Sequence, residues 1–295
     1  MFASFLPPEV DRLVEDTSIA LAQHLDRREI PTPFGPINTA FVHQGTAKPP
    51  IVLLHGFDSS VLEFRRLLPR LASKQETWAI DLLGFGFTDR PINAPFTPEG
   101  IKTHLYYFWK TCIAQPMILI GASMGGAAAI DFALSYPEAV AQLVLIDSAG
   151  FAAGPAIGRF LIPPIGYLAT EFLRQPKVRN SVSLRAYWDQ SFVSADSETC
   201  AGLHLKLPRW NQALIAFTKS GGYNFLTDKI SQVSQPTLIL WGDSDRILGT
   251  QDAERFKGAI VKSQLIWLEQ CGHVPHLEKP TLTATHIQTF VDKDF

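Results

Sequence analysis

The sequence has little of what marks secreted, membrane-spanning and nucleic-acid-binding proteins. Its 295 residues include only three cysteines, Cys112, Cys200 and Cys271, whose unrelated spacings favour neither a disulfide framework nor a metal site and indicate a reducing, cytoplasmic setting. No apolar run reaches the length that spans a bilayer, and the first residues lack the basic and apolar regions of a signal peptide. Basic and acidic residues nearly balance, at 26 and 28, with no long run of either sign, which argues against nucleic acid as a partner.

What remains is an ordinary globular composition, 46% hydrophobic and 18% charged. Short apolar runs predict buried strands, and they alternate with segments of helical periodicity, so the pattern predicts a mostly parallel sheet with helices on both faces. The predicted strands are residues 50–54, 77–80, 117–120, 142–146, 237–241 and 265–268, and the predicted helices include 62–71, 98–112 and 280–291. Upstream, residues 8–25 have the pattern of one amphipathic helix, and residues 29–44 that of a hairpin at the sheet edge.

The strand–helix alternation stops between about residues 151 and 231. This segment is rich in aromatic residues and leucine, and scattered prolines divide it into short helices. We interpret it as a helical cap inserted over the carboxyl ends of the strands. Residues 1–150 and 232–295 then form the core, and residues 151–231 form the cap.

The strand at 117–120 runs into Gly121-Ala122-Ser123-Met124-Gly125, which fits the pattern G-x-S-x-G, and an alanine-rich helical stretch follows. Strand, tight turn and helix are the context in which this motif presents a nucleophilic serine. Such a turn is strained and tolerates only small residues around the serine, which the glycines supply. The sequence therefore predicts that Ser123 is a nucleophile.

A serine hydroxyl needs an adjacent base, and the base needs an orienting acid. Asp245 follows the strand at 237–241 and His273 follows the last strand, which gives the chain order Ser, Asp, His. The spacing W-G-x-x-D favours Asp245 over Asp243, for which a loop or capping hydrogen bond is the other role. Two further alternatives remain: Asp147, which also ends a strand, as the acid, and His276 as the base.

The oxyanion of a tetrahedral intermediate needs two fixed donors. The residue after the nucleophile supplies one, the N–H of Met124, and the loop after the strand at 50–54 supplies the other, the N–H of Phe57. Gly56 lets the backbone approach the substrate, and His55 is expected to act as a scaffold hydrogen-bonding residue.

Five motifs in this order resemble the α/β-hydrolase superfamily: H-G-F at 55–57, D-L-L-G-F-G-F-T-D at 81–89, G-A-S-M-G-G at 121–126, W-G-D-S-D at 241–245 and G-H at 272–273. The resemblance implies the α/β-hydrolase fold, with a mostly parallel eight-stranded sheet, a variable cap, and no cofactor or metal. Serine as the nucleophile departs from the similar epoxide hydrolases and haloalkane dehalogenases, which use aspartate. Hydrolases of carbon–carbon bonds share Ser-Asp-His but often have Trp after the histidine, where this chain has Val274.

Two runs of the cap, residues 183–189 and 207–214, are similar to chlorophyll dephytylase and pheophytinase-like hydrolases, which cleave an isoprenoid alcohol from a tetrapyrrole ester. Tyr187, Trp188, Trp210 and Phe160 are the candidate substrate contacts in this unusually aromatic cap. The sequence leaves open whether such residues form the core of the cap, line a pocket or touch a membrane peripherally.

The function expected from these residues is hydrolysis of a small hydrophobic carboxylic ester through an acyl-enzyme. A ligand receptor on the same fold that turns over slowly or once, a carbon–carbon bond hydrolase, and an acyltransferase are the alternatives, because fold alone does not decide function.

Overall fold

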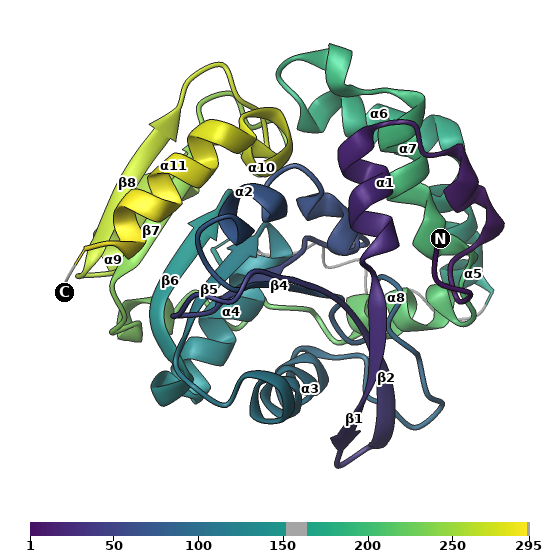
Figure 1. Ribbon diagram of the computed structural model, residues 1–295, viewed down its shortest axis with the longest axis horizontal. Helices are drawn as coiled ribbons and strands as arrows, with labels where there is room; N and C mark the ends of the chain where they lie inside the picture. Colours follow the sequence, from purple (N-terminus) through teal and green to yellow (C-terminus); the bar gives the residue numbers. More distant parts are fainter. Residues whose placement is uncertain (152–163, 294–295) are drawn as a thin grey trace.

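The computed structural model describes residues 1–151 and 164–293. Within them, eight strands form one sheet in the order β1-β2-β4-β3-β5-β6-β7-β8 (Figure 1). The strands are β1 (Asp26–Thr32), β2 (Gly35–Gln44), β3 (Ile51–Leu54), β4 (Thr77–Ile80), β5 (Met117–Ala122), β6 (Val140–Ile146), β7 (Thr237–Gly242) and β8 (Ser263–Leu268). The strands β1 and β2 form the predicted hairpin and pair antiparallel, whereas β3 to β8 run parallel. The predicted fold class is confirmed.

Helices cover both faces of this sheet. Outside the β6–β7 connection they are η1 (Pro8–Arg12), α1 (Asp16–Gln23), η2 (Val61–Phe64), α2 (Leu68–Ala72), α3 (Pro98–Phe108), η3 (Trp109–Ile113), α4 (Met124–Ser135), η4 (Pro137–Ala139), α9 (Gln251–Ala259), α10 (Pro275–Glu278) and α11 (Pro280–Val291). Apolar residues of α3, α4 and α9 pack on one face, and those of α1, α2 and α11 pack on the other. Because both faces are buried, the central strands are mostly apolar, and β3 has only apolar, buried residues.

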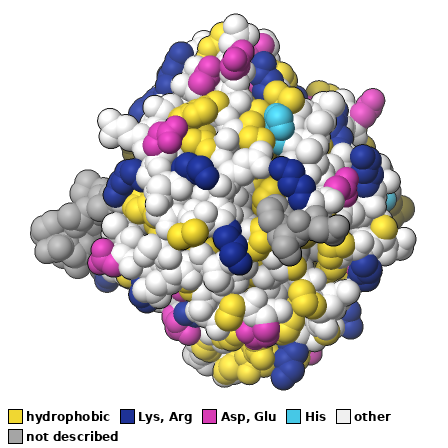
Figure 2. All heavy atoms as spheres, turned by 90° about the vertical axis from the view of Figure 1, so that its left-hand side faces the viewer, with side chains coloured by type: hydrophobic (Ala, Val, Ile, Leu, Met, Phe, Trp, Pro, Cys, Tyr) yellow, Lys and Arg dark blue, Asp and Glu magenta, His cyan; other side chains and the backbone are white. Residues whose placement is uncertain are grey.

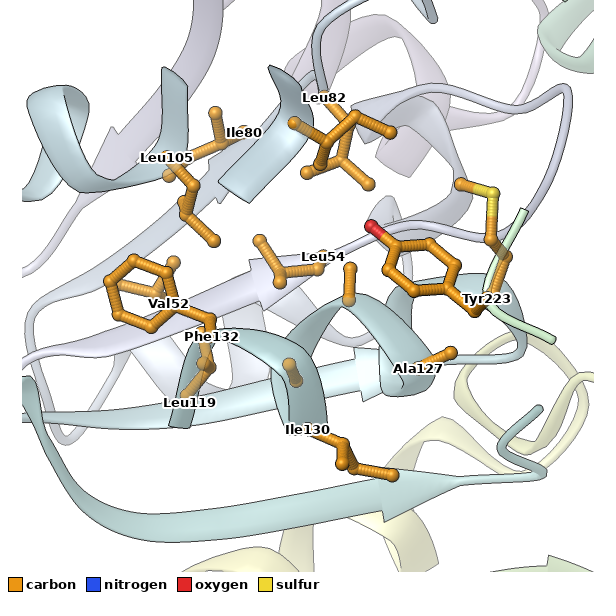
Figure 3. Close-up of a cluster of buried hydrophobic side chains, with 14 of the residues drawn as sticks. Val52, Leu54, Ile80, Leu82, Leu105, Leu119, Ala127, Ile130, Phe132 and Tyr223 are labelled. Atoms are coloured by element: carbon orange, nitrogen blue, oxygen red, sulfur yellow. The ribbon is translucent and has the colours of Figure 1, made fainter. Parts of the chain in front are cut away.

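The larger of the two cores lies between the sheet and helices α3 and α4. Figure 3 shows side chains of β3, such as Val52 and Leu54, facing Phe132 of α4 and Leu105 of α3. Tyr223, which comes from the connection between β6 and β7, lies beside α4 in the same cluster. This connection therefore shares a core with the sheet.

Two of the predicted helices are broken. Residues 8–25 form η1 and α1, separated by extended backbone at Leu13, because the carboxylate of Asp196 accepts the N–H groups of Val14 and Glu15 (2.7 and 2.9 Å). Those N–H groups are consequently not available to a continuous helix. The predicted helix at 62–71 is likewise divided into η2 and α2.

The described residues between β6 and β7 contain helices and no strand. They are α5 (Ile165–Arg174), α6 (Pro176–Ala186), η6 (Gln190–Phe192), α7 (Ala195–Gly202), η7 (Leu203–Lys206), α8 (Trp210–Lys219) and η8 (Ile230–Gln232). In Figure 1, α6 and α7 lie next to α1, where Asp196 makes the contact described above. The division into a core and a cap at residues 151 and 231 remains a prediction.

The surface has no dominant charge on the side drawn in Figure 2, where basic, acidic and apolar side chains are interspersed. The most exposed large apolar side chains on α5 are Leu168, Phe172 and Ile165. Among the residues described, no helix has both the length and the apolar character needed to cross a bilayer.

Helix α4 crosses the sheet at very short range. A Cβ atom built on Gly125 would lie 2.1 Å from the carbonyl oxygen of Leu54 in β3 and 2.6 Å from that of His55. Both obstacles are backbone atoms of a central strand and its exit, so they do not move easily.

We therefore predict that Gly125→Ala lowers the free energy of unfolding by roughly 2–3 kcal/mol or more, the upper part of the range for an overpacked core. Gly258→Ala in α9 is the matched control, because a Cβ there meets no atom within 4 Å. It should leave stability unchanged or raise it by up to ~1 kcal/mol, the gain of Ala over Gly in a helix. Urea unfolding of both variants tests this, and equal stability of Gly125→Ala and the wild type would contradict it.

Candidate active site

Ser123 lies in a strained turn between β5 and α4. Its φ and ψ are 52° and −121°, a backbone conformation that side-chain-bearing residues rarely adopt and that costs of order 1–3 kcal/mol. Hydrogen bonds from the turn fix it: Ser123 N–H donates to Ile146 O, and Ser123 O accepts from Gly126 and Ala149, each at 3.0 Å. The turn thus places Ser123 at the carboxyl end of β5, directly before the first residue of α4.

The ends of β7 and β8 bring the other two predicted residues together. His273 Nδ1 lies 2.8 Å from Asp245 Oδ2, and both residues are buried. Burial alone would raise the pKa of Asp245, but the hydrogen bond and charge of His273 and the N–H groups of Ile247 and Leu248 lower it. A carboxylate at Nδ1 fixes the tautomer of the ring and leaves Nε2 as the nitrogen that can act as a base.

The two alternative acids occupy different environments. Asp243 is exposed, and its carboxylate accepts the N–H groups of Gln270 and Cys271, so it ties together the loops that carry Asp245 and His273. Asp147 is fully buried and accepts the N–H of Gly242 at 3.0 Å. Burial and the nearby charge of Asp245 raise the pKa of Asp147 well above its usual range. The two shifts have opposite directions, which favours the protonated form of Asp147 and the ionised form of Asp245.

The side chains of Asp147, Asp245 and His273 also have the proximity of metal ligands, with donor atoms within 4.8 Å of one another. A divalent ion, however, needs deprotonated ligands. The raised pKa of Asp147 disfavours that form, and Asp245 is already engaged by His273 and two backbone N–H groups. The donor set fits an acid–base relay better than a metal.

The predicted alternative base, His276, lies in α10 and has a separate partner. Its Nε2 is 3.0 Å from Glu63 Oε1, and its ring packs against Phe64. His55 is fully buried, and its Nε2 accepts the N–H of Leu82 at 3.1 Å. Burial lowers the pKa of His55 to about 4, so this ring is a neutral part of the scaffold.

Phe57 and Met124, the predicted oxyanion donors, line the same cavity of about 510 Å³. The N–H of Met124 belongs to the first turn of α4, where backbone donors have no partner within the helix. A Cβ built on Gly56 would lie 3.3 Å from Ser123 Cβ, so the loop that carries Phe57 approaches the serine closely. Both predicted donors thus line one cavity, and Ser123 directly precedes one of them in the chain.

The cavity is largely apolar and extends under α5 and α8. Besides Phe57 and Met124 its lining includes Leu173, Leu214, Ile215, Phe217, Tyr223 and Leu248. Its walls on α5 are Gly166, Ala169, Thr170 and Leu173, a spacing that covers one face of a helix. This face of α5 was not predicted from the sequence, although small residues at helical spacing can indicate a helix face that borders a cavity.

The four predicted substrate contacts lie elsewhere or are not described. Tyr187 is buried beside Phe192, Trp188 is partly exposed, and Trp210 donates its indole N–H to Asp58; none of them is among the residues that line the cavity. Phe160 lies outside the described residues. Contact of these side chains with substrate therefore stays a prediction.

Two glutamates that were not predicted from the sequence, Glu278, which is buried, and Glu63, which is partly buried, hold the loops of the site. Glu278 accepts the N–H groups of Gly272, Trp188 and Asp189 and so joins the loop of His273 to the end of α6. Glu63 accepts the N–H of Gly56 at 3.0 Å and lies beside His276. No local pattern distinguishes either residue from a surface glutamate.

A family model described as the alpha/beta hydrolase fold matches residues 49–280, and this chain therefore belongs to the α/β-hydrolase family. The alpha/beta hydrolase domain-containing protein VTE7 of Arabidopsis thaliana is 34% identical over 98% of this chain and 90% of its own length. Lipase 1 of Psychrobacter immobilis is 28% identical over 82% of this chain and 76% of its own. A serine hydrolase involved in carbazole degradation shares the fold, with a TM-score of 0.75 over 90% of this chain and 98% of that one at 23% identity.

The environment of Glu63 makes a pH-dependent contribution to stability. Burial alone would raise its pKa, but chiefly the interaction with the neighbouring His276 ring lowers it to about 2. An acid whose folded-state pKa lies below its unfolded value stabilises the fold in full above the unfolded pKa, near 4.5. This contribution is lost as the pH falls through about 4.5 towards 2.

We predict that the difference in free energy of unfolding between the wild type and Glu63→Gln is constant above about pH 5.5 and narrows by on the order of 1 kcal/mol by pH 3.5. Urea unfolding at several pH values measures it. Glu269→Gln, at an exposed position, is the control and should differ little from the wild type throughout. A gap that is the same at pH 7 and pH 3.5 would show that Glu63 has no lowered pKa.

Proposed function

We propose that this protein is a serine hydrolase that cleaves hydrophobic carboxylic esters through an acyl-enzyme. The observation that carries the proposal is the 2.8 Å contact between Asp245 and His273, at the same sheet edge as a serine in a strained turn. Parallel strands bring their carboxyl ends to one edge, and Ser123, Asp245 and His273 lie in the loops that follow β5, β7 and β8.

In this mechanism Ser123 Oγ attacks the carbonyl carbon of the ester while His273 Nε2 accepts the hydroxyl proton. The N–H groups of Phe57 and Met124 stabilise the oxyanion of the tetrahedral intermediate. The intermediate collapses, the C–O bond to the alcohol breaks, and the protonated His273 gives its proton to the alcohol oxygen. Water, deprotonated by His273, then attacks the acyl-enzyme. The bond from the acyl carbon to Ser123 Oγ breaks, the acid leaves, and His273 returns the proton to Ser123 Oγ. Asp245 stabilises the imidazolium in both steps.

The substrate class follows from the cavity. Its lining is mainly apolar side chains of α5 and α8, which favours an acyl or alcohol chain of hydrocarbon character over a charged one. The name of one relative, Lipase 1 of Psychrobacter immobilis, is consistent with a hydrophobic ester as substrate. The similarity of residues 183–189 and 207–214 to chlorophyll dephytylases makes a phytyl ester the first natural substrate to test.

Turnover of p-nitrophenyl esters from acetate to palmitate tests the proposal. We expect sustained multiple turnover that peaks at a medium or long acyl chain, because the chain gains apolar contacts in the cavity. In Ser123→Ala, kcat should fall by at least about 10⁴-fold, as in other serine hydrolases. Equal inactivity of both proteins on every ester, or a single turnover only, would contradict the proposal and favour a ligand receptor. Faster release of nitrophenol with an added alcohol or peroxide would instead identify an acyltransferase.

The identity of the acid is tested by three isosteric variants. We predict that Asp245→Asn lowers kcat by about 10³- to 10⁴-fold, because the amide stabilises neither the correct tautomer nor the imidazolium. Asp147→Asn should stay close to the wild type, because a neutral carboxyl is replaced by a neutral amide, and so should Asp243→Asn. A loss in Asp147→Asn equal to that in Asp245→Asn would mean that Asp147 is the acid.

A further inference from the structure

Asp58 is the point at which the helices between β6 and β7 meet the loop that carries the predicted oxyanion donor. It directly follows Phe57, and its own φ of 51° lies in the left-handed region, which Asp and Asn tolerate better than most residues. Its side chain is mostly buried, at 11% exposed. A charged group in that position needs partners.

Within the described part of the chain, the hydrogen-bond partners of its carboxylate come from the connection between β6 and β7. Arg179 Nη1 of α6 donates to Oδ2 at 2.8 Å, while His204 Nε2 of η7 and Trp210 Nε1 of α8 lie 3.2 and 2.7 Å from Oδ1. Arg179 Nη2 also reaches the carbonyl oxygens of Asp58 and Ala201, at 3.4 and 2.9 Å. Three separate helical elements therefore converge on a single carboxylate.

The groups around Asp58 favour its ionised form. Burial alone would raise the pKa of Asp58, but hydrogen bonds from His204 and Trp210 and the charge of Arg179 lower it to about 2, so the carboxylate is ionised at neutral pH. A second contact joins the same loop to α8: the ring of Phe57 packs against that of Phe217, with the ring centroids 5.9 Å apart. Backbone and side chain of the 57–58 loop are thus both held by the same helices.

We propose that Asp58 is a positioning residue through which α6, η7 and α8 hold the N–H of Phe57 in place for the oxyanion. The inference rests on the proposed function. Its physical basis is that an oxyanion donor contributes only when held within about 0.5 Å of its productive position. The loop after β3 is irregular, and the hydrogen bonds to Asp58 replace the rigidity that a helix or strand would supply. Seating of these helices over the cavity then completes the oxyanion hole.

The test compares Asp58→Asn and Arg179→Met, alone and combined, with Lys177→Met, an exposed residue of the same helix, as the control. Asn keeps the shape of Asp58 and its tolerance of positive φ but loses the charge. The readout is the rate constant for labelling of Ser123 by an alkyl fluorophosphonate, which needs the nucleophile and the oxyanion hole but no deacylation. KM and kcat for the best p-nitrophenyl ester are measured alongside, well below the unfolding temperature.

We expect Asp58→Asn and Arg179→Met each to slow labelling and kcat by about 10- to 100-fold, part of the 10²- to 10³-fold loss of a whole donor, with KM little changed. The double variant should be no slower than the slower single one, because both remove the same coupling. Trp210→Phe, which removes the indole N–H and one ring of the buried indole but keeps the carboxylate of Asp58 and Arg179, should show a smaller loss of the same kind. Lys177→Met should label at the wild-type rate.

A merely structural role for Asp58 would lower the unfolding temperature and leave the labelling rate of the folded enzyme unchanged. That result, or independent losses that multiply in the double variant, would overturn the inference while leaving the proposed function intact. A wild-type protein that is not labelled at Ser123 at all would contradict the proposed function itself and remove the inference with it.

Discussion

The strained turn at Ser123 is the feature on which the rest of the site depends. It exists because α4 starts directly at the end of β5 and crosses the sheet close enough for Gly125 to touch the backbone of β3. The sheet supplies the restraint: β5 lies in the middle of the described strand order, paired on both sides by parallel strands. The packing of this large, buried region thus offsets the conformational free energy of the strained turn, and the turn positions the serine at the end of β5.

Around this rigid centre the loops of the site are fastened by buried carboxylates. Glu63 holds the N–H of Gly56, Glu278 holds that of Gly272, and Asp58 gathers donors from α6, η7 and α8. Buried charges of this kind add little net stability compared with apolar packing, but they fix direction, since each oxygen accepts hydrogen bonds along a few geometries only. This explains how irregular loops after β3 and β8 are held in defined positions. It also links the helices over the cavity to the chemistry beneath them.

Much of the fold could be predicted from the sequence, because buried parallel strands appear in it as short apolar runs. The turn at Ser123 could be predicted as well, because it needs small residues next to the serine. The chain order of Ser123, Asp245 and His273 was visible for the same reason, since each follows a strand end. What could not be predicted depends on contacts between distant residues. The break in the first helix results from Asp196, over 180 residues away. Likewise the indole of Trp210, whose aromatic character suggested a substrate contact, donates to Asp58.

The proposed mechanism requires that Ser123 Oγ carries the acyl group. The most direct measurement is mass spectrometry of the protein quenched with acid during the first turnover of a long-chain p-nitrophenyl ester, followed by peptide mapping. The acyl-enzyme mechanism predicts one acyl group per chain, located on Ser123. This group should appear together with the burst of nitrophenol and should be absent from Ser123→Ala. An acyl group on another residue, or steady turnover in the wild type with no acylated protein and no burst, would contradict it.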